Sequence, residues 1–337
     1  MTLHVVNHRS VVGSLSATDL AGDFISWDDP LFEGAVPGGI DERELRRIRS
    51  SIHGESLRDY SIDALTYFTA RDYALAAAED VLLWFEADLA CQLQLTQILA
   101  MLAGLRRSAR LICIASYPGY EGFVGLGQLN PDELLALLGS EHEVSDEELS
   151  LAAEAWGAFR APDPTAIEEL LAGDTSALPF LIDAFVRHLE EFPSALNGLS
   201  RTEGTILARV AAGTGRWTHL FNEVMEAEER PFMDDLTFRH RLEGLMTGPS
   251  PLVRGRSGKF LELMRGLRGS HPPEQPLWPA AAADELELTA AGESVLAGEA
   301  DAVELNGVDR WFGGVQLEGR APRWRWDDRE RRIISTE

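Results

Sequence analysis

The sequence is poor in lysine and in cysteine, and both scarcities narrow the kind of protein that it encodes. Lys259 is the single lysine among 30 basic residues, a bias toward arginine that indicates a GC-rich bacterial genome. The two cysteines, Cys91 and Cys113, stand in apolar stretches typical of free buried thiols. We therefore expect neither a disulfide framework nor a metal site, which fits a reducing cytoplasm.

Long apolar runs are also lacking. No stretch approaches the roughly 20 apolar residues that span a bilayer. The N-terminal apolar run covers only Leu3 to Val6 and ends before His8 and Arg9, which is too short for a signal peptide. The sequence therefore predicts a cytoplasmic protein without a membrane segment.

Several signatures of familiar chemistry are absent as well. The chain contains no H-E-x-x-H or C-x-x-C motif and its eight histidines are scattered, which argues against a zinc site. The segment GRSGKF resembles part of a phosphate loop, but Val253 and Phe260 stand where that loop needs Gly and Ser or Thr. Because no G-x-S-x-G elbow occurs, an α/β-hydrolase triad has no anchor.

What remains is the composition of an ordinary globular protein with a strong negative charge. Of its 337 residues 45% are apolar and 25% are charged, enough for a substantial core and for more than one domain. The formal net charge of -25 repels nucleic-acid phosphates over the chain as a whole. Nucleic acid is therefore not the expected partner.

Short apolar segments alternate with helical segments along the first part of the chain. We predict strands at Leu3–Asn7, Phe24–Trp27, Val81–Glu86 and Leu111–Ala115, and helices at Ser10–Leu20, Asp41–Ile52 and Leu57–Glu79, with one more that presents a single apolar face from Leu95 to Leu105. This alternation is typical of an open, mostly parallel sheet with helices on both faces. Residues 1–125 are therefore expected to form an α/β ligand-binding domain.

A helical, acidic connector is expected over residues 126–197 and a further domain over 198–337. Ser200 and Glu203 have the spacing of a capping box, so a helix is expected to start there. Two more helices follow, and then the segments PLVRG and ELEL, which have the pattern of two strands separated by a long insertion. This order predicts a winged-helix-like α+β domain, through which the chain is expected to contact another domain or form a homodimer.

Polar residues follow each predicted strand of the N-terminal sheet. Ligands bind an open parallel sheet beyond the carboxyl ends of its strands, which gives the candidate ligand-binding residues Asn7, His8, Arg9, Ser10, Asp28, Glu33 and Gln92 and the candidate catalytic residues Glu86 and Asp88. Asp88 and Gln92 lie four residues apart at a helix start and so share one helix face. Arg9 is the expected contact for an anionic group of the ligand.

These residues also have ordinary structural explanations. Asp88 has the position of a helix cap, and Asp28 that of a turn before Pro30. The Gly-rich segment YPGYEGFVGLGQ lacks the spacing of a dinucleotide loop and is interpreted as a connection or a lid. Clustered carboxylates suit acid and base chemistry, a divalent cation or a cationic substrate, so the cofactor stays open and no metal ligand is assigned.

The predicted winged-helix region raises the alternative of DNA binding. Its candidate phosphate contacts are Arg239, Arg241, Arg254, Arg256 and Lys259. Acidic residues near the second helix, among them Glu226 and Glu228, oppose that alternative. The long insertion between the two presumed wing strands opposes it too.

Segments from nearly the whole chain resemble one known family. They are LHVVN, SVVGSL, WDDPLFEGAVP, LWFEADLACQLQL, GLGQL, FPSALNGLSRTE, ERPFMDDLTF and LNGVDRWFGGVQL. In this order they are similar to the bacterial domain of unknown function 1835 (DUF1835) family, usually found with a C-terminal companion domain. The resemblance implies an α/β N-terminal domain and a winged-helix-like C-terminal part, but no reaction.

The chain departs from that family pattern at two places. The family's opening loop usually reads Asn-Gly-Asp-Ser, whereas here His8 and Arg9 stand between Asn7 and Ser10. Family members often have His before the Asp of the third-strand loop, where this chain has Ala87. If those positions carry the family's chemistry, this chain has lost or redirected it.

Three functional hypotheses follow from the sequence. The first is a bacterial cytoplasmic protein whose α/β domain binds a small polar or phosphorylated metabolite, with a winged-helix interaction or regulatory module. The second is a biosynthetic transferase, lyase or hydrolase that uses Glu86 or Asp88, with or without a metal. The third is a DNA-binding regulator.

Overall fold

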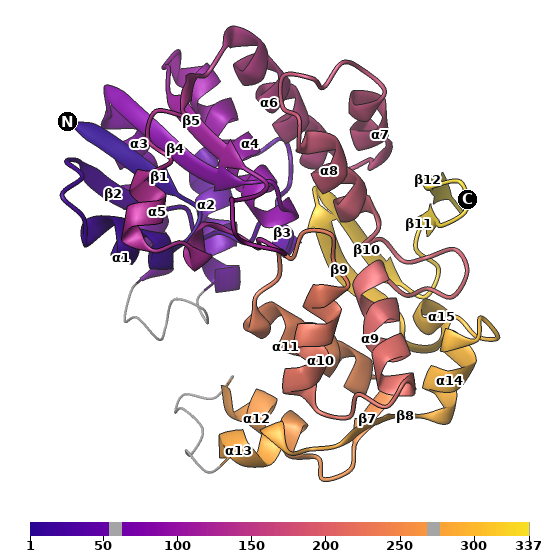
Figure 1. Ribbon diagram of the computed structural model, residues 1–337. Coiled ribbons are helices and arrows are strands. Elements are labelled where there is room, and N and C mark those ends of the chain that lie inside the picture. The colour runs from indigo at the N-terminus through magenta and orange to yellow at the C-terminus, as the bar shows by residue number, and fades with distance from the viewer. Residues whose placement is uncertain (54–62, 268–276, 337) are drawn as a thin grey trace. The chain divides into compact units, whose positions relative to one another are not determined.

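The structure is a computed structural model and describes residues 1–53, 63–267 and 277–336 (Figure 1). The chain divides into two compact units. The first contains Met1–Arg187 and Gly313–Val315, and the second contains His188–Phe312 and Gln316–Glu337. Within the described residues, every helix is too short or too polar to cross a lipid bilayer.

The first unit is built on a five-stranded sheet in the order β2-β1-β4-β5-β6 (Figure 1). Its strands are β1 (Thr2–Val6), β2 (Asp23–Ser26), β4 (Asp80–Glu86), β5 (Arg110–Ile114) and β6 (His142–Glu143). The first four in this order are parallel, and β6 is antiparallel to β5. The predicted α/β class with a mostly parallel sheet is therefore confirmed.

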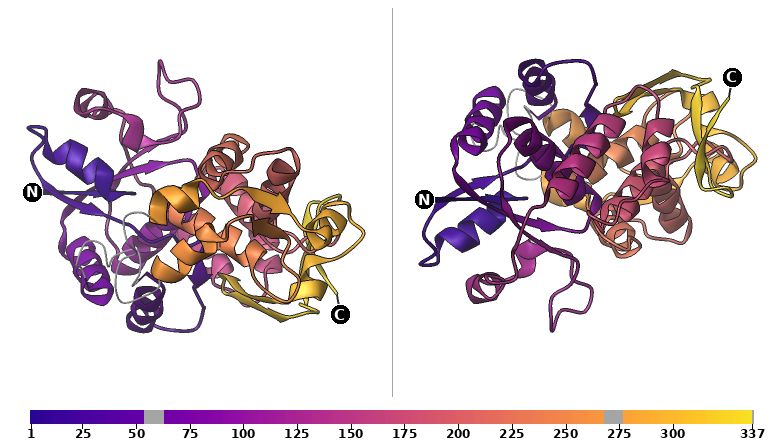
Figure 2. Two further views of the ribbon diagram at one scale, coloured as in Figure 1. Left: turned by 90° about the horizontal axis from the view of Figure 1, so that it is seen from below. Right: turned by 90° about the horizontal axis from the view of Figure 1, so that it is seen from above.

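Helices cover both faces of this sheet (Figure 2). One face carries α1 (Arg9–Ser16) and α5 (Pro131–Leu135), and the other carries α2 (Glu42–His53), α3 (Ala64–Ala77) and α4 (Leu89–Leu105). Because β4 lies between two covered faces, its apolar residues from Val81 to Phe85 are at most 2% exposed. The helix predicted at Leu57–Glu79 corresponds to α3, and its residues 57–62 lie outside the described residues.

Helix α4 is buried on nearly all sides, whereas its sequence predicted a single buried face. Its polar residues Gln92, Gln94, Thr96 and Gln97 are buried together with its leucines. Part of the cover comes from the loop after β2, where the Trp27 indole donates to the Gln97 side chain and the Asp29 carbonyl accepts from Gln94. Another part comes from α6 (Asp146–Phe159), which packs along α4. This packing also places residues 126–187 in the first unit, so the two units differ from the expected ranges 1–125, 126–197 and 198–337.

Short elements complete the first unit. They are β3 (Gly34–Ala35), the 3-10 turn η2 (Leu126–Gln128), α7 (Thr165–Leu171) and the start of α8 (Leu181–Leu189). The chain returns to this unit at Gly313, whose carbonyl accepts a 2.9 Å hydrogen bond from the backbone N–H of Val36. Two segments far apart in the sequence are joined in this way.

The second unit begins with three helices and a pair of antiparallel strands. They are α9 (Arg201–Ala211), α10 (Trp217–Glu226), α11 (Asp235–Met246), β7 (Val253–Gly255) and β8 (Leu286–Leu288). Between the two strands lie α12 (Lys259–Leu267) and α13 (Leu277–Ala282). The predicted order of elements is present, while the winged-helix assignment itself stays a prediction.

Two short helices and four strands complete the chain, and of these, residues Gly313–Val315 belong to the first unit. They are α14 (Ala290–Leu296), α15 (Ala302–Asn306), β9 (Val308–Gly313), β10 (Val315–Gly319), β11 (Trp324–Asp327) and β12 (Arg332–Ser335). Strands β11 and β12 pair in antiparallel fashion. Strands therefore run through the Arg- and Trp-rich C-terminal part of the chain.

The predicted capping box begins α9. The Ser200 hydroxyl accepts from the backbone N–H of Glu203 at 3.2 Å, and the Glu203 carboxylate accepts from the backbone N–H of Ser200 at 2.9 Å. Replacing Ser200 by Ala is expected to lower the free energy of unfolding by about 1 kcal/mol, as measured by urea titration. Ser200→Thr keeps the hydroxyl and serves as the control; equal losses in both variants would contradict the capping role.

Candidate functional site

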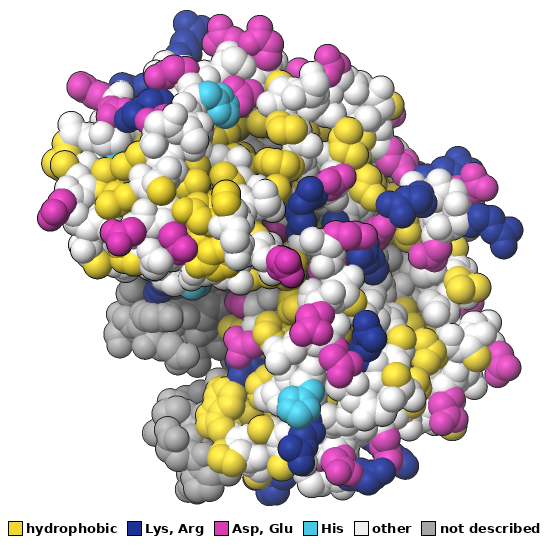
Figure 3. Space-filling view, in the orientation of Figure 1, with side chains coloured by type: hydrophobic (Ala, Val, Ile, Leu, Met, Phe, Trp, Pro, Cys, Tyr) yellow, Lys and Arg dark blue, Asp and Glu magenta, His cyan; other side chains and the backbone are white. Residues whose placement is uncertain are grey.

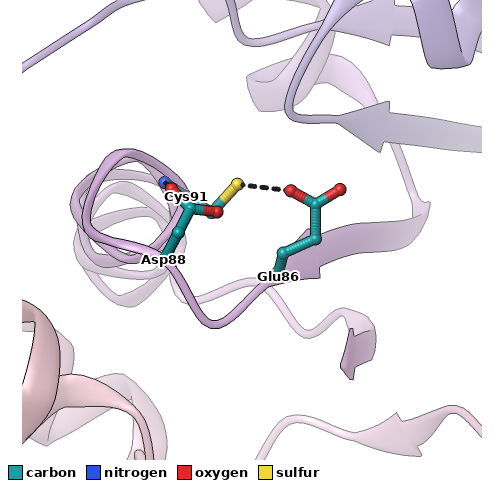
Figure 4. A group of neighbouring side chains, drawn as sticks. All are labelled: Glu86, Asp88 and Cys91. Carbon is teal, nitrogen blue, oxygen red and sulfur yellow. Dashed lines mark hydrogen bonds between the residues drawn. The ribbon is translucent and has the colours of Figure 1, made fainter. Parts of the chain in front are cut away.

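Asn7 and Glu86 meet where the neighbouring strands β1 and β4 end. The Asn7 side-chain amide donates to Glu86 Oε2 at 2.9 Å and to the sulfur of Cys91 at 3.3 Å. The Cys91 thiol in turn donates to the same Glu86 oxygen at 3.0 Å (Figure 4). The rule that parallel strand ends gather functional groups therefore places two predicted residues together and adds Cys91 to them.

Asp88 lies beside this group and caps α4. Its Oδ1 accepts the backbone N–H of Cys91 at 3.1 Å, so the ordinary structural explanation of Asp88 applies. Asp88 caps the helix and still belongs to the site. One carboxylate oxygen each of Glu86 and Asp88 and the sulfur of Cys91 lie within 4.8 Å of one another. We call Asn7, Glu86, Asp88 and Cys91 the edge cluster.

Burial alters the acid chemistry of the edge cluster. Glu86 is 5% exposed, Asp88 6% and Cys91 3%. Removal from water, with the neighbouring Asp88 carboxylate as the next cause, raises the pKa of Glu86 to about 8. Burial also raises the pKa of Asp88 and of Cys91. At neutral pH the edge cluster therefore favours a protonated Glu86 and a protonated thiol.

Gln92 supports the edge cluster from the first turn of α4. Its side-chain amide donates to the backbone carbonyl of Glu86 at 2.7 Å. The same amide lies 3.5 Å from the sulfur of Cys113. Gln92 thus holds the end of β4, and its predicted place near Asp88 and Glu86 is observed.

A loop that sequence analysis did not assign to the site covers Glu86. The backbone N–H of Leu126 donates to Glu86 Oε1. A Cβ atom on Gly125 would lie 2.9 Å from the Glu86 carboxyl carbon, so the glycine allows this close approach. Both residues lie in the Gly-rich segment YPGYEGFVGLGQ, which the sequence indicated as a connection or a lid without giving it a partner.

Arg9 lies against an acidic side chain of the protein itself. Its Nε donates to Asp28 Oδ2 at 2.8 Å, and its backbone N–H donates to Asp28 Oδ1 at 3.1 Å. We had expected Arg9 to meet an anionic group of a ligand. The guanidinium instead meets the Asp28 carboxylate, because the ends of β1 and β2 are adjacent in the sheet.

His8 and Ser10 lie at the start of α1. The His8 ring accepts the backbone N–H of Ser10 at 3.2 Å and lies 2.9 Å from the Ser10 hydroxyl. Both residues are exposed. His8 therefore has a structural task as the helix cap, and the two side chains stand at the solvent side of the strand edge.

Glu33 lies beside a buried ion pair that follows β2. Arg49 Nη2 donates to Asp29 Oδ1 at 2.6 Å, and both residues are 1% exposed. The backbone carbonyl of Glu33 accepts from Arg49 Nη1 at 2.6 Å. Glu33 thus contributes its backbone to the surroundings of this pair, which anchors α2 to the loop after β2.

Among the described residues, Glu86, Asp88 and Cys91 are the one set whose donor atoms are grouped closely enough to hold a metal ion. Their atoms already have partners: Glu86 Oε2 accepts from Asn7 and Cys91, and Glu86 Oε1 accepts from Leu126. A cation would have to replace the thiol proton and turn the Asn7 amide. The arrangement therefore fits protons better than a metal.

The basic residues proposed for DNA binding are buried or paired in the second unit. Arg239 and Arg241 on α11 are 6% and 9% exposed, which removes them from a phosphate backbone. The others pair with carboxylates: Arg254 with Glu287, Arg256 with Glu285 and Glu287, and Lys259 with Glu262. On the face drawn in Figure 3, basic side chains lie among acidic ones and form no continuous basic surface.

No family model matches the chain, and no curated protein matches its sequence. Membership of the domain of unknown function 1835 family therefore stays a prediction.

Proposed function

We propose that the first unit binds a small polar metabolite at the carboxyl edge of its sheet. The observation that carries the proposal is the edge cluster, in which an amide, two carboxyl groups and a thiol converge from β1, β4 and α4. The Asn7 side-chain oxygen is buried there without a hydrogen-bond partner in the described structure. Buried polar atoms without a partner are rare in proteins, and a ligand donor would satisfy this one.

The groups at this edge favour a ligand that donates hydrogen bonds. Glu86 and Asp88 offer a phosphate no positive charge, and the Arg9 guanidinium is already paired with Asp28. Of the polar and phosphorylated metabolites suggested by the sequence, hydroxylated or amine-bearing compounds therefore suit the site better. His8 and Ser10, exposed at the rim, would meet the part of the ligand nearest to solvent.

An enzyme is the second candidate, and the state of Glu86 favours it. A carboxyl group with a pKa of about 8 holds its proton at neutral pH yet can release it. General acids and bases work best when their pKa lies near the working pH. We propose Glu86 as the group that exchanges a proton with the ligand and Asp88 as the neighbour that tunes it, in a transferase, lyase or hydrolase.

For the second unit we propose an interaction or regulatory module of winged-helix type. The backbone N–H of Leu286 donates to the carbonyl of Gly215 at 2.6 Å, which connects the segment before α10 to β8. A short strand at this place is expected in a winged helix. Because Arg239 and Arg241 are buried, a protein contact, including a homodimer, is favoured over DNA. A bacterial cytoplasmic setting remains part of the proposal.

The test is a thermal-shift screen of the full chain against polyols, amines, amino acids and phosphorylated sugars, with and without Mg²⁺ or Mn²⁺. A true ligand at 100 times its Kd stabilises the folded state by about 2.7 kcal/mol. We expect that shift in the wild type and in the control variant Glu79→Gln. Glu79 is an exposed carboxylate directly before the first residue of β4, at the end of the strand away from Glu86. Glu86→Gln should abolish the shift. Equal shifts in both variants, or none with any compound, would overturn the proposal.

A further inference from the structure

The carboxyl and thiol groups of the edge cluster are closed to solvent in the conformation described, whereas Asn7 is partly exposed. Glu86, Asp88, Cys91 and Gln92 are each at most 6% exposed. Two of the walls around them are the end of β4 and the first turn of α4, both regular elements held by backbone hydrogen bonds. The third wall is the loop after β5, which contributes Gly125 and Leu126. A ligand must therefore displace the loop.

The hydrogen bonds of this loop run mainly to the residues that follow it, in η2 and α5. We call residues Tyr117–Leu126 the lid segment. The Tyr117 hydroxyl donates to the Glu133 carbonyl at 3.4 Å, and the Tyr120 hydroxyl donates to the Glu133 carboxylate at 2.9 Å. Over the described chain, the hydrogen bonds recorded for the lid segment end within residues 117–133, apart from that between Leu126 and Glu86. Two tyrosines therefore hold the lid segment to α5, and the hydrogen bond of Leu126 holds it to the end of β4.

The backbone of the lid segment suits a hinged movement. Gly119, Gly122 and Gly125 have φ angles of +87°, +71° and +154°, which other residues adopt only under strain. A Cβ atom on Gly119 or Gly122 would meet no atom within 4 Å, so space does not restrict that part of the loop. The part of the loop around Gly119 and Gly122 therefore combines glycine backbone with open space around it.

Aromatic side chains keep the lid segment together as it moves. Tyr117 and Tyr120 pack edge to face with ring centres 5.8 Å apart, and Tyr120 and Phe123 do so at 6.4 Å. All three are partly buried against the core that contains Leu126. The three rings therefore form one packed group, and opening of the lid segment must also release this group from that core.

We infer that the lid segment is a gate over the edge cluster, which opens by releasing Leu126 from Glu86 and lets a ligand reach Glu86, Asn7 and Cys91. The nature of the occupant rests on the proposed function, whereas the opening does not. Because opening removes the fully buried Leu126 from the core, the open state is a minor one. Any ligand, whether a phosphorylated compound or a polyol, could reach Glu86 only in this open state.

Cys91 can report this opening, because its buried thiol donates to Glu86, the same carboxyl group to which Leu126 of the lid segment is bonded. In the full chain carrying Cys113→Ser, we would measure the rate of Cys91 alkylation by N-ethylmaleimide with mass spectrometry. Tyr120→Phe removes the hydroxyl that binds Glu133 and should raise the rate by about tenfold, the size of one charge-assisted hydrogen bond. Tyr73→Phe, on an exposed tyrosine of α3, is the matched control and should leave the rate unchanged.

The outcomes separate the lid from global unfolding and from ligand binding. Gly122→Ala strains the loop without a clash and should also accelerate alkylation. The inferred gate would be contradicted if neither Tyr120→Phe nor Gly122→Ala changes the rate of Cys91 alkylation. It would also be contradicted if that rate follows the urea-induced unfolding of the whole chain. A lid that opens while no compound of the screen slows alkylation would support the gate and count against the proposed ligand site.

Discussion

Asp29→Ala is expected to lower the free energy of unfolding by about 3–5 kcal/mol, because it removes the carboxylate that a buried guanidinium binds through two of its nitrogens. Arg49 donates to Asp29 through Nε at 3.0 Å and through Nη2 at 2.6 Å. Among the described residues, Arg49 also donates to the backbone carbonyls of Glu33 and Pro30. Urea titration followed by circular dichroism measures the loss.

The neighbouring carboxylate provides the control. Asp28 pairs with Arg9, whose side chain is 23% exposed, so Asp28→Ala should cost only about 1–2 kcal/mol. Replacing the buried pair by Asp29→Leu with Arg49→Met should restore much of the lost stability, because no isolated charge remains. Equal losses at positions 28 and 29 would show that the structure misplaces the buried pair.

Stability should fall as the pH rises because Glu86 is buried. Its pKa is about 8 in the folded protein, against 4.5 ordinarily. Between these values the folded state keeps a proton that the unfolded state has released, so the free energy of unfolding decreases by about 1.4 kcal/mol per pH unit. The loss approaches about 5 kcal/mol at pH 8, and the contribution is fully present only below pH 4.5.

Glu86→Gln isolates this effect, since all other titrating groups stay in place. Urea titrations at pH 5, 6, 7 and 8 should show a steeper decline in the wild type than in Glu86→Gln. Burial also raises the pKa of Asp88, so the variant retains a smaller decline of the same sign. Parallel curves for the two proteins would mean that Glu86 is ionised throughout this range and is therefore in contact with water.

The sheet could be predicted from the sequence because its strands are short apolar segments between helices. The predicted segment Val81–Glu86 lies within β4, and the capping box at Ser200 begins α9 as expected. The apolar strand segment and the capping box are both determined by residues close together in the sequence, which makes them predictable. The single buried face predicted for α4 was wrong, because α4 is also covered by the loop after β2 and by α6, which lies some fifty residues further along the chain.

The candidate site was predictable in position but not in detail. The strand-end rule brought Asn7 near Glu86, since it depends only on strands being parallel. The pairing of Arg9 with Asp28 and the cover by Leu126 depend on strand order and on a loop path. The requirement for glycine at position 125 comes from its close contact with Glu86, a residue distant in sequence, so the sequence alone does not reveal it.

The two residues that depart from the resembled family have visible tasks in this chain. His8 caps α1, and Arg9 joins the ends of β1 and β2 through Asp28. Both tasks are structural, and neither blocks the edge cluster. We therefore place the proposed chemistry on Glu86 and its partners and not on the His8 and Arg9 pair.

Carbon-13 NMR of the full chain labelled at the glutamate Cδ atoms measures the protonation of Glu86 directly, with Glu86→Gln to assign its resonance. The buried site predicts a titration midpoint near pH 8. It also predicts that the midpoint moves when a ligand from the screen is added. A midpoint near the ordinary 4.5 would contradict the buried, proton-holding carboxyl group, and the roles proposed for Glu86 in binding and in proton exchange would be lost with it.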